Sequence, residues 1–188
     1  MPLNITFTLS DRDLRHFQDV IDRAKSAMKS DHSYEEIKQA AKQLIIDAKA
    51  RGLPDFIADR LGKLQVLIDM LEDGEWQLGE AEQERVLSAM MYFCDPDDLI
   101  PDDVPGLGFL DDAIYVELMI QELKSEIGSY DEFCQFRAEE ETRRRKDGLD
   151  PHVQREDWLA DKRATLHASI KSRRHRRMTE TGSWRLFW

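Results

Sequence analysis

The chain has 188 residues, of which 41% are hydrophobic and 35% charged, so it can form one folded core inside a strongly solvated surface. This composition excludes general disorder. The formal net charge of −11 makes the chain as a whole repel nucleic acid and anionic lipid, so only a local basic surface could bind either. Such a surface is predicted near the C-terminal end, because residues 1–140 contain 31 acids and 14 bases, whereas residues 141–188 contain 7 acids and 13 bases.

The first elements are a short extended segment and a helix. Apolar and polar residues alternate over residues 3–9, which predicts a half-buried strand or an extended arm. One strand cannot form a sheet, so this arm either pairs with its copy in a second subunit or lies in a groove. From Ser10 the apolar spacing becomes helical and predicts a first helix that ends near Met28.

Five or six further helices follow at short intervals. Apolar stripes, capping residues and glycine stops predict helices over residues 34–51, from Pro54 to Gly74, and over 80–93. A further helix runs from Asp111 to Gly128, the next begins at Ser129 and ends by Gly148, and Asp150 with Pro151 starts a mostly polar last one. The predicted fold class is all-α, an antiparallel bundle of six or seven helices.

The spacing of the cysteines and the length of the apolar runs predict the redox state and the location. Cys94 and Cys134 have no CxxC spacing, so both are expected to be reduced. The first residues lack a basic region followed by an apolar run, and no apolar run approaches the roughly 18 residues that span a bilayer. We therefore expect a cytoplasmic protein that does not span a membrane.

The long connection between Phe93 and Asp111 is the most unusual segment. It is well beyond the usual ~4 to 6 residues, and loops of this length in compact domains are commonly functional or ordered by their own packing. Prolines and apolar pairs predict tight turns here, with an ordered acidic hairpin between the fourth and fifth helices. The turns are expected at Pro96, Pro101, Pro105 and Gly108, and the apolar anchors are Leu99, Ile100, Leu107 and Leu110.

This segment resembles a known bacterial family, the YkvA-like domain of unknown function (DUF1232). The family signature has a Tyr-Phe pair, an Asp-Leu-Ile-Pro-Asp run, then Pro, Gly and a closing Asp-Asp pair. The matching residues are Tyr92, Phe93, Pro96, Asp98, Leu99, Ile100, Pro101, Asp102, Pro105, Gly108, Leu110, Asp111 and Asp112. The resemblance is dense over residues 92–114, extends to about 80–127 and implies a fold element rather than a reaction. We expect residues 1–148 to form the bundle and residues 149–188 a basic helical extension.

The aspartates of the hairpin allow two interpretations. Asp98, Asp102, Asp111 and Asp112 could supply hard oxygen ligands to a divalent cation, which would make the chain a metal-dependent phosphoester hydrolase. The spacing excludes an EF-hand. In the favoured interpretation, Asp111 caps the fifth helix, Asp98 and Asp102 accept backbone N–H groups around the turns, and the protein has no cofactor.

The basic end of the chain offers a second candidate site. Its cations could bind nucleic acid or anionic lipid, and its aromatic side chains could stack on bases or lie at a membrane interface. The favoured alternative is that the basic helix folds over the acidic body or a neighbouring subunit and that the terminal aromatics fill a hydrophobic groove. The residues concerned are Lys171, Arg173, Arg174, Arg176, Arg177, Trp184 and Trp188.

No catalytic residue is predicted. The histidines lack metal-ligand spacing, and the serines lie in capping contexts without a nucleophile motif. Taken together, the sequence predicts a non-enzymatic protein-interaction or regulatory module that forms a homo-oligomer, with a dimer expected from the N-terminal arm, the sparse apolar face of the last helix and the aromatic terminus.

Overall fold

The computed structural model describes residues 34–94 and 109–180, together with residues 8, 10–12, 14, 15, 17–19 and 22. The side chains of residues 177–180 lie outside this description. Its helices are α2 (Tyr34–Ala50), α3 (Asp55–Glu72), α4 (Glu80–Met90), α5 (Leu110–Glu122), α6 (Lys124–Lys146) and α7 (Arg155–Glu180). A 3-10 turn, η1 (Met91–Cys94), extends α4. The predicted all-α class is confirmed.

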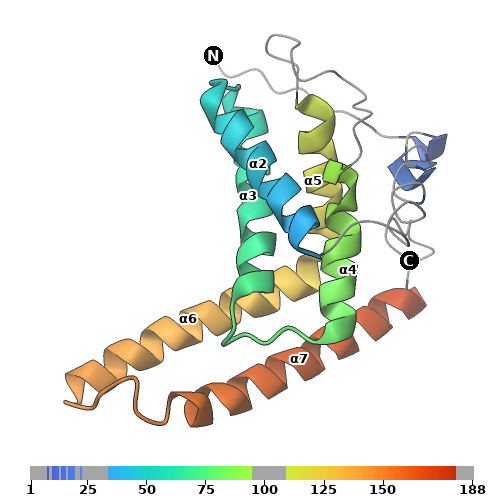
Figure 1. Cartoon of the computed structure of the whole chain (residues 1–188). Helices are drawn as coiled ribbons and strands as arrows, with labels where there is room; N and C mark the ends of the chain where they lie inside the picture. Colours follow the sequence, from blue (N-terminus) through green and yellow to red (C-terminus); the bar gives the residue numbers. More distant parts are fainter. Residues whose placement is uncertain are drawn as a thin grey trace, which may run out of the picture.

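Helices α2 to α5 stand side by side as a bundle, with α3 packed against both α2 and α5 (Figure 1). The apolar stripe of α3 explains its central place, because Ile57, Leu61, Leu64 and Ile68 are all buried. Positions three and four residues apart lie on one helix face, so these side chains form a continuous surface for both neighbours. The bundle therefore has one apolar core built around α3.

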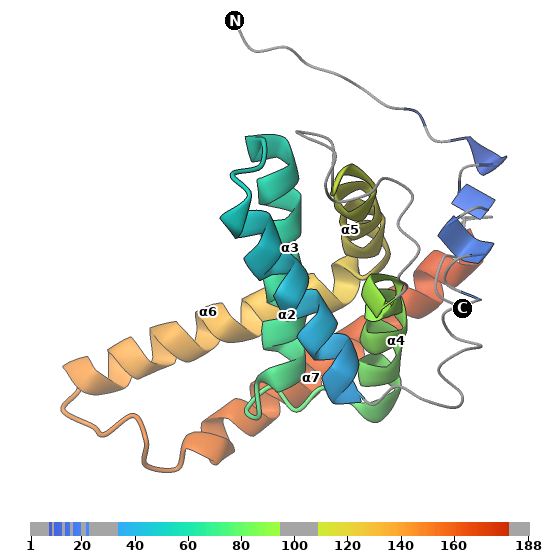
Figure 2. The ribbon, with the colours of Figure 1, turned by 45° about the horizontal axis from the view of Figure 1, so that its top comes forward.

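Helices α6 and α7 form an antiparallel hairpin that crosses the lower end of the bundle (Figures 1 and 2). We call residues 124–180 the arm, and the connection between its helices, residues 147–154, the arm tip. The tip lies well outside the bundle in both views. The inner face of α7 contributes Leu159, Leu166 and Ile170 to the core, so the basic last helix packs along the rest of the chain.

The first predicted helix is described in part. Residues 11, 12, 14, 15, 17–19 and 22 are helical, and Phe17 is buried. The extension to Met28 lies outside the described residues, as does the predicted strand or arm over residues 3–9 apart from Thr8.

The predicted boundary between the fifth and sixth helices is wrong. It was expected at Gly128 and Ser129, but α5 ends at Glu122 and α6 continues through both residues. The chain turns instead at Leu123, whose side chain is fully buried and whose N–H donates to the carbonyl of Met119 at 2.8 Å. Burial of Leu123 fixes the turn there, and the helix tolerates an interior glycine at a cost of about 1 kcal/mol.

The predicted start of the last helix at Asp150 and Pro151 is also wrong. Asp150 accepts a hydrogen bond from the N–H of His152 at 2.8 Å within a turn, and α7 begins at Arg155. Gln154 has a left-handed backbone with φ 54°. A residue in that conformation interrupts a right-handed helix, so Pro151 belongs to the connecting turn.

Candidate functional site

An aromatic cluster lies where η1 meets α5. The rings of Tyr92 and Tyr115 are stacked with centroids 4.0 Å apart, and Phe17 and Phe93 pack against Tyr115. The Tyr115 hydroxyl donates to the carbonyl of Ala89 at 2.7 Å. Burial raises the pKa of Tyr115, so it remains a neutral hydrogen-bond donor. The cluster fixes both ends of the long connection between η1 and α5.

Two candidate ligands, Asp111 and Asp112, lie in the first turn of α5 and are 4% and 5% exposed. The Tyr92 hydroxyl donates to Oδ2 of Asp111 at 3.3 Å. The prediction that Asp111 caps this helix is wrong, because Phe109 occupies the N-cap position with φ 68° and no side-chain cap bond is made. The carboxylates instead lie beside the positive end of the helix dipole, where negative charge is attracted.

The rest of the predicted hairpin site lies outside the described residues. This applies to Pro96, Asp98, Pro101, Asp102, Pro105 and Gly108. Within the ranges that the structure describes, no group of three or more His, Cys, Asp or Glu side chains is placed to hold a metal ion. A cation bound by Asp98, Asp102, Asp111 and Asp112 therefore stays a prediction.

The basic residues of α7 divide into two groups. Lys171, Arg173 and Arg176 are exposed, whereas Arg174 is half-buried with its Nη1 atom 3.8 Å from a carboxylate oxygen of Glu82 on α4. The side chain of Arg177 and residues Trp184 and Trp188 lie outside the described part of the chain. Arg174 thus attaches the basic helix to the bundle, in line with the favoured interpretation, while its neighbours face solvent.

The connection between α3 and α4 is a further site, which the sequence analysis did not single out. Trp76 is fully buried, with its ring 5.8 Å from that of Tyr130 and 5.1 Å from that of Phe133, both on α6, and 4.4 Å edge-on from His167 on α7. Oδ1 of Asp73 accepts the N–H groups of residues 75 and 76 at 2.9 and 3.2 Å. This Asx-turn orients the indole between the two helices of the arm.

Three arginines of the arm converge on Glu75. Its carboxylate accepts hydrogen bonds from Arg155, with one N–O distance of 2.9 Å, and from Arg137 at 2.8 Å. Arg163 donates to its backbone carbonyl at 2.8 Å. The hydrogen bond from Arg155, followed by that from Arg137, lowers the pKa of Glu75 despite partial burial. We call residues 73–76 with these partners the joint, because they attach the arm to the bundle.

Three further contacts strengthen the attachment of the arm to the bundle. Arg137 also lies 2.8 Å from Oδ2 of Asp73, which in addition accepts the Tyr130 hydroxyl at 3.2 Å. On the α4 side, Arg85 pairs with the buried carboxylate of Glu126 at the start of α6. A largely buried ion pair such as Arg85–Glu126 is costly to break, since removing one partner leaves the other charge without compensation.

Comparison with known proteins places the chain in a family. A family model described as a protein of unknown function (DUF1232) matches residues 85–118, which include Tyr92, Phe93 and Tyr115 of the aromatic cluster and the start of α5. The uncharacterized membrane protein YkvA of Bacillus subtilis (strain 168) is 32% identical over 76 residues, covering 37% of this chain and 70% of the relative. The chain belongs to the DUF1232 family. No solved structure matches it.

The membership confirms the family resemblance of the acidic hairpin. The matched segment of this DUF1232 protein brings Tyr92, Asp111 and Tyr115 into contact, and it does not include the joint or α7. Among the helices that the structure describes, none combines the length and the apolar character needed to cross a membrane.

We predict that Asp111 acts as a hydrogen-bond acceptor in the folded protein. Asp111→Ala should lower the free energy of unfolding by about 1–2 kcal/mol, because the Tyr92 hydroxyl loses its partner, whereas Asp111→Asn keeps an acceptor oxygen and should cost less. Asp55→Ala, in the exposed first turn of α3, is the control for the helix-dipole contribution. Urea denaturation in the presence of EDTA measures the free energy of unfolding of all three variants. A melting temperature that rises by several degrees with magnesium, manganese or calcium, and no longer does so in Asp111→Asn, would contradict this prediction and support a cation site.

Proposed function

We propose that the protein is a non-enzymatic interaction module whose contact surface is the arm, and that its first partner is a second copy of the same chain. The observation that carries this proposal is the extension of the α6–α7 hairpin beyond the bundle, which leaves the arm tip accessible (Figures 1 and 2). A projecting helical hairpin held at one end by a rigid joint can present its tip to a partner without disturbing the core.

The arm tip holds apolar side chains in a defined turn. Gly148 has φ 72° and ends α6, and the N–H of Leu149 returns to the carbonyl of Arg144 at 2.9 Å, as in a Schellman motif. Within this turn Leu149 is 54% exposed and Val153 is 57% exposed. Two large apolar side chains on one short connection form a small patch that a partner can cover.

The charges beside the tip favour a second copy over a strongly charged partner. Arg143 pairs with Glu140 at 2.6 Å and with Asp147 at 3.4 Å, and Arg145 pairs with Glu141 at 3.1 Å. Both signs are therefore present along the same stretch. In a twofold contact each patch meets its own copy, so a patch of mixed sign can be self-complementary whereas a patch of one sign repels itself.

The use of the charged groups supports a binding role rather than a catalytic one. Glu75, Arg137 and Arg155 hold the arm against the bundle, and Arg144 and Arg155 also cover the ring of Trp158 at 5.2 and 5.4 Å. Each of these contacts stabilises the position of the arm. A rigidly held arm loses less conformational freedom when a partner binds, which favours association.

The self-association proposal predicts a dimer that depends on the tip. Sedimentation at micromolar concentration should give a mass near twice 22.0 kDa. Val153→Asp should weaken the dimer at least tenfold, about 1.4 kcal/mol, because a charge would be buried in the contact. Ile46→Asp on α2 is the matched control, since Ile46 has the same exposure of 57% but lies on the bundle. A monomer at all concentrations, or equal weakening by both variants, would sink the proposal.

A second candidate is attachment to an anionic membrane surface through the end of α7. Two observations favour it: the relative from Bacillus subtilis is called a membrane protein, and Lys171, Arg173 and Arg176 are all exposed within two turns of α7. The cytoplasmic leaflet carries anionic lipids that attract such cations by about 1 kcal/mol each. This candidate fits the proposed cytoplasmic location and uses residues distinct from the arm tip, so both functions can coexist.

Vesicle binding tests the second candidate. Vesicles with about 30% phosphatidylserine should bind the protein at low salt and release it as salt screens the charges, whereas neutral phosphatidylcholine vesicles should not bind it. The double variant Lys171→Glu, Arg173→Glu should lose binding, and Lys49→Glu on α2, also exposed, should retain it. The candidate would be rejected if the protein sedimented equally with anionic and neutral vesicles, or if both variants sedimented equally with the anionic vesicles.

A further inference from the structure

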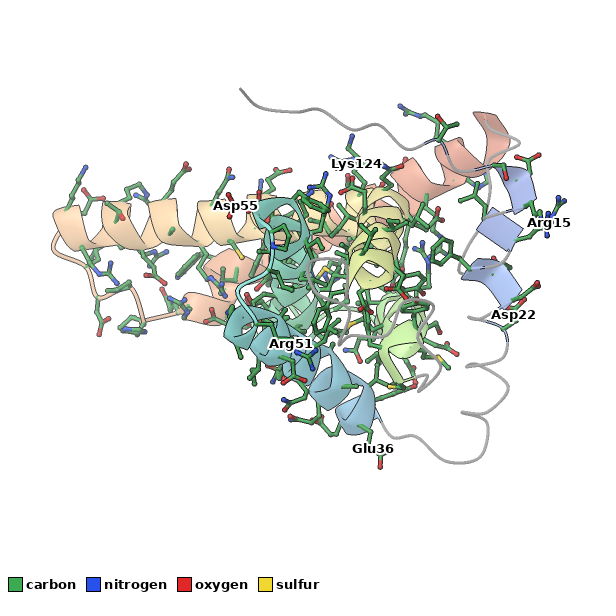
Figure 3. The ribbon with its side chains drawn as sticks, turned by 90° about the horizontal axis from the view of Figure 1, so that it is seen from above. Arg15, Asp22, Glu36, Arg51, Asp55 and Lys124 are labelled. Carbon is green, nitrogen blue, oxygen red and sulfur yellow. The ribbon has the colours of Figure 1, made fainter. Side chains whose placement is uncertain are left out.

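His167 lies near the middle of α7, the helix that Figure 3 shows passing beneath the bundle. Its imidazole packs edge-on against the buried indole of Trp76, with ring centroids 4.4 Å apart. The Nε2 atom is buried and has no hydrogen-bond partner among the residues that the structure describes. An imidazolium carries a proton on both ring nitrogens, so protonation would place a buried donor there without an acceptor. The contact therefore suits a neutral ring.

The charged side chains beside His167 oppose a proton on its ring. Arg163 and Lys171 lie four residues before and after it on α7, and side chains at this spacing share one helix face. Like charges at this spacing repel each other. On α4, Glu82 is 7% exposed, and one of its carboxylate oxygens lies 3.8 Å from Arg174. The carboxylate that could compensate an imidazolium therefore already has a cationic partner.

Further charged and titratable groups of the adjoining elements are engaged with one another. They come from the α3–α4 connection, α4, α6 and α7, and their contacts are Glu75 with Arg137 and Arg155, Glu126 with Arg85, Tyr130 with Asp73, and Arg163 with Glu156. A carboxylate that already accepts an arginine hydrogen bond offers little compensation to a new charge. Protonation of His167 would thus add a cation to an interface that is not arranged to receive one.

We propose that His167 is a pH-sensitive switch of the arm: the neutral imidazole permits α7 to pack on Trp76, and protonation of the ring weakens the attachment of the arm to the bundle. The electrostatics of the ring agree with this geometry. Burial lowers the pKa of His167, and Arg163 and Lys171 lower it further, against the opposing effects of Glu82 and of a hydrogen bond with the Trp76 backbone. The switch concerns contacts within one chain, so it does not depend on what the arm binds.

The lowered pKa sets the direction of the switch. When the arm is detached, the imidazole is solvated and has its ordinary pKa of 6.5, so the detached state binds a proton at a higher pH than the attached state. Attachment is therefore at full strength above pH 6.5, and it weakens as the pH falls from 6.5 to the lowered pKa. Glu75 stays charged down to about pH 5, because its own pKa is lowered from 4.5. The switch thus acts at a higher pH than the loss of the Glu75 ion pairs.

Amide exchange of the full-length chain at about pH 7.5 and pH 5.5 tests the switch, with rates expressed as protection factors to remove the intrinsic effect of pH. In the wild type the protection of α7 should fall by about threefold or more in acid, while that of α2 stays constant. His167→Gln, which is neutral at both pH values, should abolish the fall. His175→Gln is the matched control at an exposed position of the same helix and should retain it. Constant protection of α7 in the wild type, or an equal fall in α2 or in His167→Gln, would overturn the proposal.

A second measurement needs no variant. Titration of the His167 imidazole by NMR in the wild-type protein follows the ring directly, and its signal is identified by the contact with the indole protons of Trp76. The ring should titrate below its ordinary pKa of 6.5. A titration at or above 6.5 would mean that Glu82 and the indole stabilise the charged ring, and it would overturn the proposal.

Discussion

The structure depends on the insertion of Trp76 between the two helices of the arm. This fully buried side chain packs against Phe133 on α6 and His167 on α7, and Glu75 beside it accepts hydrogen bonds from arginines on both helices. An amphipathic hairpin with few apolar residues has little tendency to pack by burial alone. The indole supplies the burial, and the ion pairs fix the angle at which the arm leaves the bundle.

This arrangement separates the molecule into regions with different roles. The segment that identifies the DUF1232 family runs from α4 into α5 within the bundle, where the Tyr92 hydroxyl donates to Asp111 and the Tyr92 ring stacks on that of Tyr115. The arm carries the surfaces proposed to bind partners. The family match ends at residue 118, before the first residue of the arm.

Helical periodicity predicted most of the fold because α2, α3 and α4 each carry a clear apolar stripe. The errors arose where a tertiary contact overrides a local signal, as when buried Leu123 sets the turn before α6 although Gly128 offers a helix stop. The joint could not be predicted, since Glu75 and Arg155 are 80 residues apart and neither belongs to a motif. The sequence offered one signal for the joint, a Trp that follows the Asp73-Gly74 turn, and the structure shows that this Trp is buried.

The exchange of backbone amides in α7 tests the joint most directly. At pH 7, Glu75→Gln should speed exchange in α7 and leave α2 unchanged, because the arm opens without unfolding of the bundle, whereas Glu84→Gln, an exposed control on α4, should change neither. The pKa of Glu75 is lowered in the folded protein, so its contribution is present above its ordinary pKa near 4.5 and is lost as the pH falls through the lowered value. The difference between wild type and Glu75→Gln should therefore vanish in acid. Unchanged protection of α7 at pH 7, or equal loss in every helix, would contradict this account of the arm.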